Sequence, residues 1–302
     1  MKFYRLSWIT TVIIGIQMVL AGIIVGEDAG FVCPKWPVCG RPVSMSGSLI
    51  FELVHRFTAG LLGILVVWLL IWLFLRYRHN RAMIWTGVLG LVSLIIQIVY
   101  AGLIVLFVLP GTATTVDVLN SVIMLSLFVH LSNLAKHEDE REHGVVAQPD
   151  SRFAKLKPAA WVLYASGMVA VAAGAVFRHT GASQALFGED SYILSHGQHV
   201  PPSHATSETL LIIHIVTAAL LMLAGIWFVE RTFAAKRLTK AAGLTLICIL
   251  IQGGLGIASL QTRLQTVVVT THWAVAGLIM GVIAFALSRI YIGLSGAKAP
   301  AK

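Results

Sequence analysis

The stretch LVHRFTAGLL, Leu53 to Leu62, recurs without a gap as IIHIVTAALL, Ile212 to Leu221. The two stretches place His55 and His214 at the same position of an internal repeat. Both histidines lie near one end of an apolar segment of membrane length, and so does His272. An ionisable side chain inside a membrane is costly, so each of the three is a candidate functional residue. The sequence therefore predicts a membrane protein of two related halves that carries its chemistry on histidines.

The composition excludes an ordinary soluble protein. Of the 302 residues, 57% are hydrophobic and 12% are charged, and the mean hydropathy is +0.85. Runs of about 20 apolar residues recur, each long enough to cross a ~30 Å hydrocarbon core as a helix. The first run continues to Val25 without a convincing cleavage site, so it is expected to be a span and not a signal peptide. We expect an all-α integral membrane protein with eight transmembrane helices, at residues 8–26, 51–75, 82–109, 114–134, 159–177, 208–229, 240–260 and 266–291.

The net charge of +9 follows the expected topology and requires no nucleic-acid partner. The positive residues gather in alternate connections, around Arg5, Arg78, Lys155, Arg237 and the C-terminus. Cytoplasmic loops carry the excess of Lys and Arg in membrane proteins. We therefore expect a multi-pass protein of the cell membrane, embedded in lipid, with both termini in the cytoplasm.

The repeat divides the chain into two halves. We expect a four-helix half at 1–136, a cytoplasmic linker at 137–157 that contains HEDEREH, and a second four-helix half at 158–302. Both halves begin on the cytoplasmic side, so they are expected to be parallel repeats related by an axis along the membrane normal. Further matches pair AGIIVGEDAG with AGAVFRHTGA, LIIQIVYAGL with ILIQGGLGIA, and VDVLNSVIML with VVTTHWAVAG.

The last of these matches places Asn120 opposite His272. All three candidate histidines and Asn120 are expected at similar depths, under the extracytoplasmic surface. Neutral imidazole between helices is a ligand for haem iron, so His214 and His272 are predicted to clamp one iron between them. The first half offers His55 and Asn120. A neutral amide is a poor iron ligand, so that site is expected to be five-coordinate or water-ligated.

The first outer loop carries Cys33 and Cys39. In an oxidising compartment the pair could form a structural disulfide, or a strained bridge that is redox-active. Just beyond the loop, Glu52 and His55 are three residues apart and share a helix face. Glu52 could move protons or steer a substrate beside a haem ligand, or it could pair with Arg56 at the interface. Both readings stay open from the residues alone.

The segment EDAGFVCPKWPVCG followed by ELVHRF resembles the haem A synthase family. The RHT of Arg178 to Thr180, the paired Gln-containing helices, and His214 and His272 resemble it too. The resemblance covers nearly the whole chain. It implies an eight-helix membrane enzyme, an oxidoreductase that converts haem O to haem A for terminal oxidase assembly by oxidising a porphyrin methyl to a formyl group.

The resemblance also implies roles for individual residues. Haem b would be held as a cofactor between His214 and His272, and haem O would bind as the substrate in the first half. There Glu52 and His55 match the family's catalytic positions. Cys33 and Cys39 match a cysteine pair that forms a disulfide in members that have it. From their place near the outer surface, Arg56 and Arg178 are each expected to pair with a haem propionate or to anchor the interface. The partners implied are haem O, haem O synthase, a terminal oxidase and an unknown electron donor.

The chain departs from the family pattern in two places. Asn120 stands where a second first-half histidine is expected, and His130, about 15 Å further along the helix, cannot replace it. The second outer loop lacks a cysteine pair and has His196, His199 and His204 instead. We expect these three histidines in a solvated loop, with a copper or zinc site as the alternative.

Three other functions compete with a haem-oxidising enzyme. One is a membrane b-type cytochrome that carries electrons without modifying haem, which the absence of a second first-half ligand favours. Another is a non-enzymatic haem carrier for oxidase assembly. A transporter is the weakest alternative, because no pair of broken helices with a substrate site is evident.

Overall fold

The computed structural model describes residues 2–27, 29–33, 35–39, 45–145, 148–188 and 202–295. Within these ranges the regular structure is entirely helical, and eight helices are long and apolar enough to cross a membrane. The prediction of an all-α membrane protein is confirmed. The eight long helices are α1 (Phe3–Gly26), α2 (Gly47–Arg76), α3 (Arg81–Phe107), α4 (Gly111–Glu142), α5 (Lys157–His179), α8 (His204–Ala235), α9 (Thr239–Gln261) and α10 (Thr266–Ser295). Two short elements accompany them, the 3₁₀ helix η1 (Ser151–Leu156) and α6 (Ala182–Ala185).

Polar residues set several helix boundaries. The side chains of Ser46, Asn80 and Ser203 accept hydrogen bonds from backbone N–H groups in the first turns of α2, α3 and α8, as capping residues do. Val108, in the left-handed region at φ 47°, ends α3 two residues earlier than the apolar run predicts. Pro110 follows and keeps the chain extended before α4 begins.

Helix α4 is longer than the sequence predicts. It continues to Glu142, so the first part of the segment expected as a linker is helical. Glu138 explains the extension: it is only 4% exposed, accepts a hydrogen bond from Asn80 at 3.0 Å and pairs with Arg141 and His79. A paired, hydrogen-bonded carboxylate can be buried at a helix end. The charged stretch therefore packs against the turn between α2 and α3.

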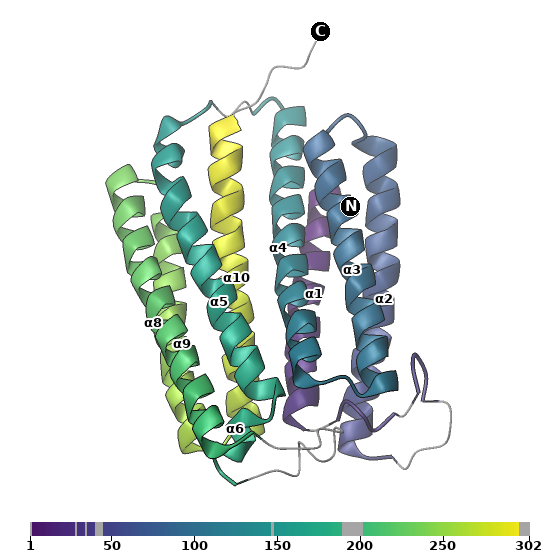
Figure 1. Cartoon of the computed structure of the whole chain (residues 1–302). Coiled ribbons are helices and arrows are strands. Elements are labelled where there is room, and N and C mark those ends of the chain that lie inside the picture. Colours follow the sequence, from purple (N-terminus) through teal and green to yellow (C-terminus); the bar gives the residue numbers. More distant parts are fainter. Residues whose placement is uncertain are drawn as a thin grey trace.

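The helices form two groups side by side, α1–α4 and α5 with α8–α10 (Figure 1). In the first group α1 contacts α2 and α4, and α3 contacts α4; in the second α5 contacts α8 and α10, and α9 contacts α10. These are the neighbour pairs that two parallel repeats would give, and the repeat itself stays a prediction. Helices α4 and α10 lie in the centre: 61% and 56% of the residues in their most apolar stretches are buried, against 22–33% in the other six.

Small residues of α1 let α10 approach closely. Gly22 and Gly26 are four apart, the spacing of a close helix–helix contact in membranes. A Cβ atom at Gly22 would lie 2.7 Å from Cδ1 of Trp273, and one at Gly26 would lie 2.6 Å from Cγ2 of Thr266. The hydroxyl of Thr266 also donates to the carbonyl oxygen of Gly26 at 3.1 Å. The first and last helices thus interlock where the two groups meet.

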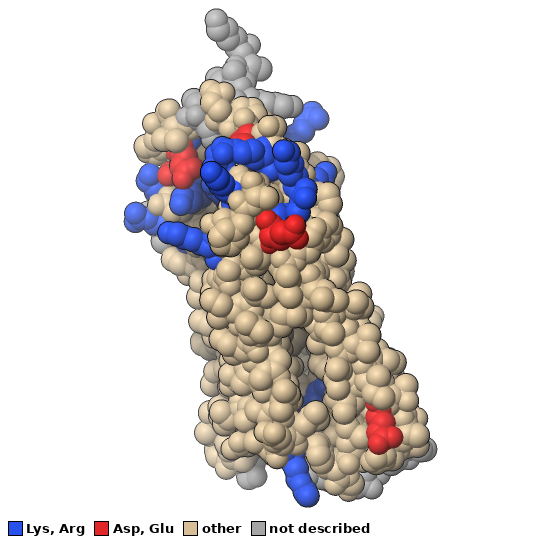
Figure 2. All heavy atoms as spheres, turned by 90° about the vertical axis from the view of Figure 1, so that its left-hand side faces the viewer, with Lys and Arg blue, Asp and Glu red and all other residues tan. Residues whose placement is uncertain are grey.

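The two ends of the bundle differ in charge. Figure 2 shows Lys and Arg gathered at one end of the molecule. We call it the basic end; it holds the connections at 77–80, 143–156 and 236–238. The histidine end is the opposite one, with the connections at 27–46, 108–110 and 262–265. The protein is a multi-pass membrane protein, and the cytoplasmic location of the basic end and both termini stays a prediction.

Candidate functional site

The rings of His214 and His272 come together in the second group of helices. His214 lies in α8 and His272 in α10, and their ring centroids are 6.4 Å apart with planes inclined at 75°. Two imidazole nitrogens that each bind one metal ion at about 2 Å would put their ring centroids about 6 Å apart. The spacing therefore fits a pair of axial ligands on one iron, as their positions in the sequence predict.

Glycines make room for both rings. A Cβ atom on Gly174 of α5 would lie 2.7 Å from Cε1 of His214, and one on Gly256 of α9 would lie 3.4 Å from Cε1 of His272. The first separation is far too short for any side chain to be tolerated without movement of the ring. The backbone of α5 is thus part of the wall that positions His214.

The surroundings of the Nδ1 nitrogens also bear on whether these two rings could bind iron. Nδ1 of His214 and Nδ1 of His272 are buried and form no hydrogen bond of normal geometry, although a backbone carbonyl lies near each ring, from Ala170 and Gln252 respectively. A histidine that ligates a metal usually donates its other ring N–H to such a carbonyl. With iron bound at the other nitrogen of each ring, a small rotation of the ring would let Nδ1 donate to that carbonyl and would remove the cost of a buried unpartnered polar atom. The residues present therefore fit a haem b group.

His55 has a different environment. Nε2 of Gln17, in α1, lies 2.9 Å from Nδ1 of His55 and donates to the carbonyl oxygen of His55 at 2.9 Å. The hydroxyl of Thr58 donates to Oε1 of Gln17 at 2.7 Å. The same amide nitrogen lies 3.3 Å from Nε2 of His55, so Gln17 contacts both ring nitrogens and would have to leave one of them for His55 to bind a metal. Gln17 was not predicted as a site residue; a glutamine inside an apolar span is the signal that could have found it.

The side chain of Asn120 forms its hydrogen bonds with residues of α3. Its Nδ2 donates to the carbonyl oxygen of Ser93 at 2.9 Å and to Oε1 of Gln97 at 2.7 Å, and its Oδ1 accepts from the hydroxyl of Ser93 at 2.9 Å. These bonds use both donors and the acceptor of the amide. Asn120 therefore does not replace the missing histidine as a free group facing His55.

Both oxygens of Glu52 hold the first outer loop. Oε2 accepts from the backbone N–H of Cys33 at 2.8 Å, and Oε1 pairs with Arg56. The guanidinium of Arg56 also donates to the carbonyl oxygens of Lys35, at 2.6 Å, and Cys33, at 3.2 Å. The pairing with Arg56 is one of the two readings that the sequence leaves open. The predicted catalytic role of Glu52 and the propionate role of Arg56 stay predictions.

The loop itself is closed by a disulfide between Cys33 and Cys39. Cys33 is fully buried, and the ring of Trp36 packs against α3 at Gly102, where a Cβ atom would lie 3.2 Å from the indole. The loop therefore spans from the first turns of α2 to α3 and covers the histidine end of the first group. His55 lies one turn below Glu52 on the same helix, so the loop forms the rim above it.

Arg178, near the end of α5, reaches the other group of helices. Its Nη2 donates to the carbonyl oxygen of Val25 in α1 at 3.2 Å. It thus lies at the histidine end, where a propionate would have to be, and its predicted contact with haem stays a prediction.

Asp117 is a further candidate residue that was not predicted from the sequence. It lies in α4, interacts with Gln97, and has a buried Oδ1 with no hydrogen-bond partner. The sequence signal is plain in retrospect, because a carboxylate inside an apolar span is a functional candidate by default. The gapless match drew attention to Asn120, three residues further along.

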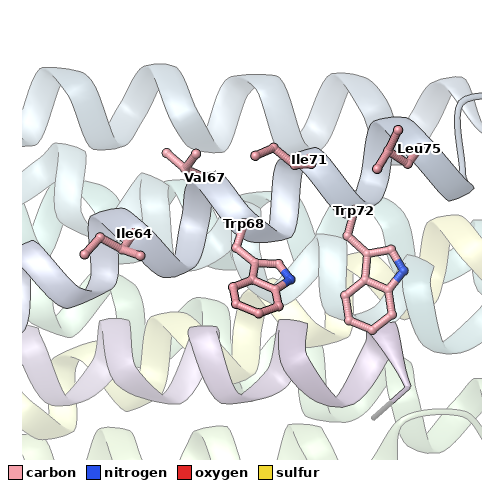
Figure 3. A pocket seen from close by; sticks show the side chains of 6 residues that line it. All are labelled: Ile64, Val67, Trp68, Ile71, Trp72 and Leu75. Carbon is pink, nitrogen blue, oxygen red and sulfur yellow. The ribbon is translucent and has the colours of Figure 1, made fainter.

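The other described surfaces carry fewer residues that could bind a metal ion or take part in catalysis. The hollow along α2 in Figure 3 is lined by apolar side chains and the indoles of Trp68 and Trp72, with no acid or histidine. The described residues contain no cluster of three or more His, Cys, Asp or Glu that could hold a metal ion. Of the predicted loop histidines, His204 begins α8 and lies 3.5 Å from Glu208, while His196 and His199 fall outside the described residues.

Residues 43–284 match the COX15-CtaA family, described as cytochrome oxidase assembly protein. The chain belongs to this family. The matched range includes α2 to α9 and most of α10, and so it contains His55, His214 and His272.

Members of the family with curated names resemble the chain over most of its length. It is 26% identical over 275 residues to the "Heme A synthase" of Shouchella clausii, covering 85% of this chain and 86% of the relative. It is 24% identical over 301 residues to that of Bacillus licheniformis, covering 93% and 94%, and 27% identical over 292 residues to that of Halalkalibacterium halodurans, covering 91% and 89%. The family and these relatives place the chain among oxidoreductase-type enzymes of haem-dependent oxidase assembly.

Proposed function

We propose that this protein is a haem A synthase, which oxidises a methyl substituent of haem O to a formyl group. Family membership and the relatives named Heme A synthase support the proposal. The observation that carries it is the pair of facing rings of His214 and His272, 6.4 Å apart inside the membrane-spanning bundle. Dioxygen would be the oxidant for such a reaction, and the external electrons that reduce its second oxygen atom to water would need a resident redox site of this kind.

In this proposal His214 and His272 hold haem b. When bound, haem b supplies one-electron transfer to the reaction in the first group of helices. Gly174 keeps the space that the His214 ring occupies, and the carbonyls near both rings are placed to accept their Nδ1 protons. Arg178 lies at the same end of the bundle and would pair with a propionate.

Haem O would bind in the first group, on the side of His55. Gln17 contacts the imidazole and Thr58 bonds to Gln17, and the loop closed by Cys33 and Cys39 is held against α2, one turn from His55. Glu52 and Arg56 hold this loop over the site. The contacts of Glu52 and Arg56 support a role for both residues in positioning the loop. Proton transfer by Glu52 stays part of the proposal.

The topology fits the pathway that the substrate implies. Haem O is a membrane-soluble porphyrin, which an upstream haem O synthase would deliver through the lipid, and a terminal oxidase would receive the product. We propose that the basic end faces the cytoplasm, with both termini, since Lys and Arg gather there. The reaction site then lies near the outer surface. The electron donor to haem b is a separate partner.

One observation favours a second function. Asn120 is bonded to Ser93 and Gln97, so it gives the first group no second ligand opposite His55. A b-type cytochrome that binds haem only in the second group would show the same geometry there. The two functions differ in product, since only the synthase changes the porphyrin.

The test is to express the full chain in a host that makes haem O but no haem A, and to identify the extracted haems by chromatography and mass spectrometry. Formyl or hydroxymethyl haem that disappears with His55→Ala supports the synthase. His214→Ala and His272→Ala should remove haem b, while His204→Ala, an exposed position in the same helix as His214, should leave it bound. Haem B alone in the wild-type protein would support the electron carrier and overturn the synthase.

A further inference from the structure

Helix α4 carries a carboxyl group at the depth where α10 carries its histidine. Asp117 lies six residues after Gly111, the first residue of α4, and His272 lies six residues after Thr266, the first residue of α10. Both helices begin at the histidine end. Each side chain is therefore about 9 Å along its helix from that end. Counted from the helix starts, the counterpart of His272 is Asp117 and not Asn120.

The face of α4 that carries Asp117 is turned into the first group of helices. Residues seven and eleven positions further along a helix share a face with the first, and for Asp117 these are Met124 and Phe128. Both are core residues, 3% and 2% exposed, and the ring of Phe128 packs on α3 at Gly90. Asp117 thus faces the interior that α4 shares with α3.

One oxygen of Asp117 has no hydrogen-bond partner among the polar groups around it. Ser93, Asn120 and Gln97 form a connected set of hydrogen bonds between α3 and α4, and Gln97 also interacts with Asp117. Oδ1 of Asp117 is buried and has no hydrogen-bond partner. A buried carboxylate oxygen without a partner is expensive, more so in a membrane.

We propose that Asp117 is the α4 residue that would provide an oxygen donor to the iron of a haem substrate bound at His55. The proposal rests on the function proposed above and assigns its first-half site. The Ser93–Asn120–Gln97 set then acts as the support that holds Asp117 in place. An oxygen donor is a weaker-field ligand than a second imidazole. The substrate iron therefore stays high-spin, unlike the iron between His214 and His272.

The chain offers a matched pair of variants to test this assignment. Asp117→His and Asn120→His each place an imidazole on α4, at the two competing positions. Full-length protein in detergent is loaded with ferric haem B as the probe, and haem content and spin state are measured by absorption and electron paramagnetic resonance spectroscopy. The low-spin signal of the second-half site reports that each variant is folded.

We expect two haems per wild-type chain, one low-spin and one high-spin, with the high-spin haem lost in His55→Ala. Asp117→His should convert the high-spin signal to low-spin at unchanged haem content. Asn120→His breaks the hydrogen bonds that support Asp117, so it should weaken binding of the high-spin haem without converting its signal. Asp117→Asn, which keeps the shape, should weaken binding of the high-spin haem by about 10- to 100-fold, the scale for residues that support a metal site.

Two results would overturn the assignment in different ways. If Asn120→His converts the signal and Asp117→His and Asp117→Asn leave it unchanged, Asp117 has no contact with the iron while the proposed synthase stands. If every folded variant and the wild type hold a single low-spin haem, the first half binds no haem, and the proposed function fails together with the assignment.

Discussion

The indole N–H of Trp273 donates a hydrogen bond to the backbone carbonyl oxygen of Met18, with 2.7 Å between nitrogen and oxygen. Trp273 directly follows His272 in α10, and Met18 belongs to α1. Trp273 also packs against Gly22, one turn further along α1. The first helix of the first half thus positions a candidate haem ligand of the second half.

This relationship predicts that Gly22→Ala disturbs the haem b site from outside it. The new Cβ atom would lie 2.7 Å from Trp273, so the indole and the following turn of α10 must move. Overpacking of this kind costs about 1–3 kcal/mol. We expect a lower unfolding temperature and a lower haem b content in purified protein. Gly15→Ala, in the same helix with nothing within 4 Å of its Cβ, should change neither quantity. Equal losses in both variants would contradict the coupling.

Gly174→Ala should act on His214 directly. Its Cβ atom would lie 2.7 Å from Cε1 and 3.3 Å from Nε2 of the ring, so the imidazole must turn away from His272. We expect loss of the low-spin haem b spectrum with the chain still folded, measured by absorption spectroscopy and circular dichroism on one preparation. Gly254→Ala, with open space at its Cβ, serves as the control. An unchanged spectrum in Gly174→Ala would show that haem b binds elsewhere.

Glu52→Gln should loosen the outer loop. The change removes the ion pair with Arg56 and weakens the bond from the N–H of Cys33. Arg56 keeps its bonds to backbone carbonyls of the loop, so the expected loss is about 1.5–3 kcal/mol, the range for a hydrogen bond to a charged group. We expect the bridge between Cys33 and Cys39 to become reducible at a lower concentration of reductant, measured by labelling of the released thiols. Glu208→Gln, whose side chain is 57% exposed, should leave the reduction curve in place. If Glu52→Gln also leaves it in place, Glu52 does not hold the loop.

The hydrogen bonds of Asp150 at the basic end predict that the stability of the protein depends on pH. Hydrogen bonds from Arg152 lower the pKa of Asp150 below its ordinary value, and Arg237 donates to Oδ2 of Asp150 at 2.7 Å. Because the pKa is lower in the folded state, the stabilisation is present above the unfolded value of about 3.9 and is lost as the pH falls through the folded value. Asp150→Asn should therefore lower the unfolding temperature at neutral pH, with a difference that narrows below about pH 4. A constant difference across this range would contradict the pairing.

Much of the fold could be predicted from the sequence, because membrane spans are set by length and apolar content. The pair of His214 and His272 could also be predicted, since the repeat and the depth of each histidine bring them together without knowledge of side-chain packing. The extension of α4 could not, because it depends on how Glu138 meets Asn80 and His79. Spans are read from apolar content, and a charged stretch gives no such signal.

Asp117 was not predicted as a candidate for the first-half site, for a physical reason. Alignment of the repeats compares residues by number, so it paired Asn120 with His272 and passed over Asp117. Which residue faces a ligand depends on where each helix begins, and α4 and α10 begin at different points of the repeat. The bonds of Glu52 to the loop also depend on the fold, because the backbone of Cys33 comes within reach only when the loop folds back over α2.

The interlocking of α1 and α10 has a consequence for biosynthesis. The hydroxyl of Thr266 reaches a carbonyl 240 residues earlier in the chain. At roughly 5–20 residues per second, the ribosome needs on the order of 10–50 s to deliver the last helix after the first has entered the bilayer. During that interval the glycine face of α1 is exposed to lipid. Nascent chains released before α10 emerges would lack the surface that joins the halves, and under the proposed function haem could be loaded at His272 only after this surface has formed.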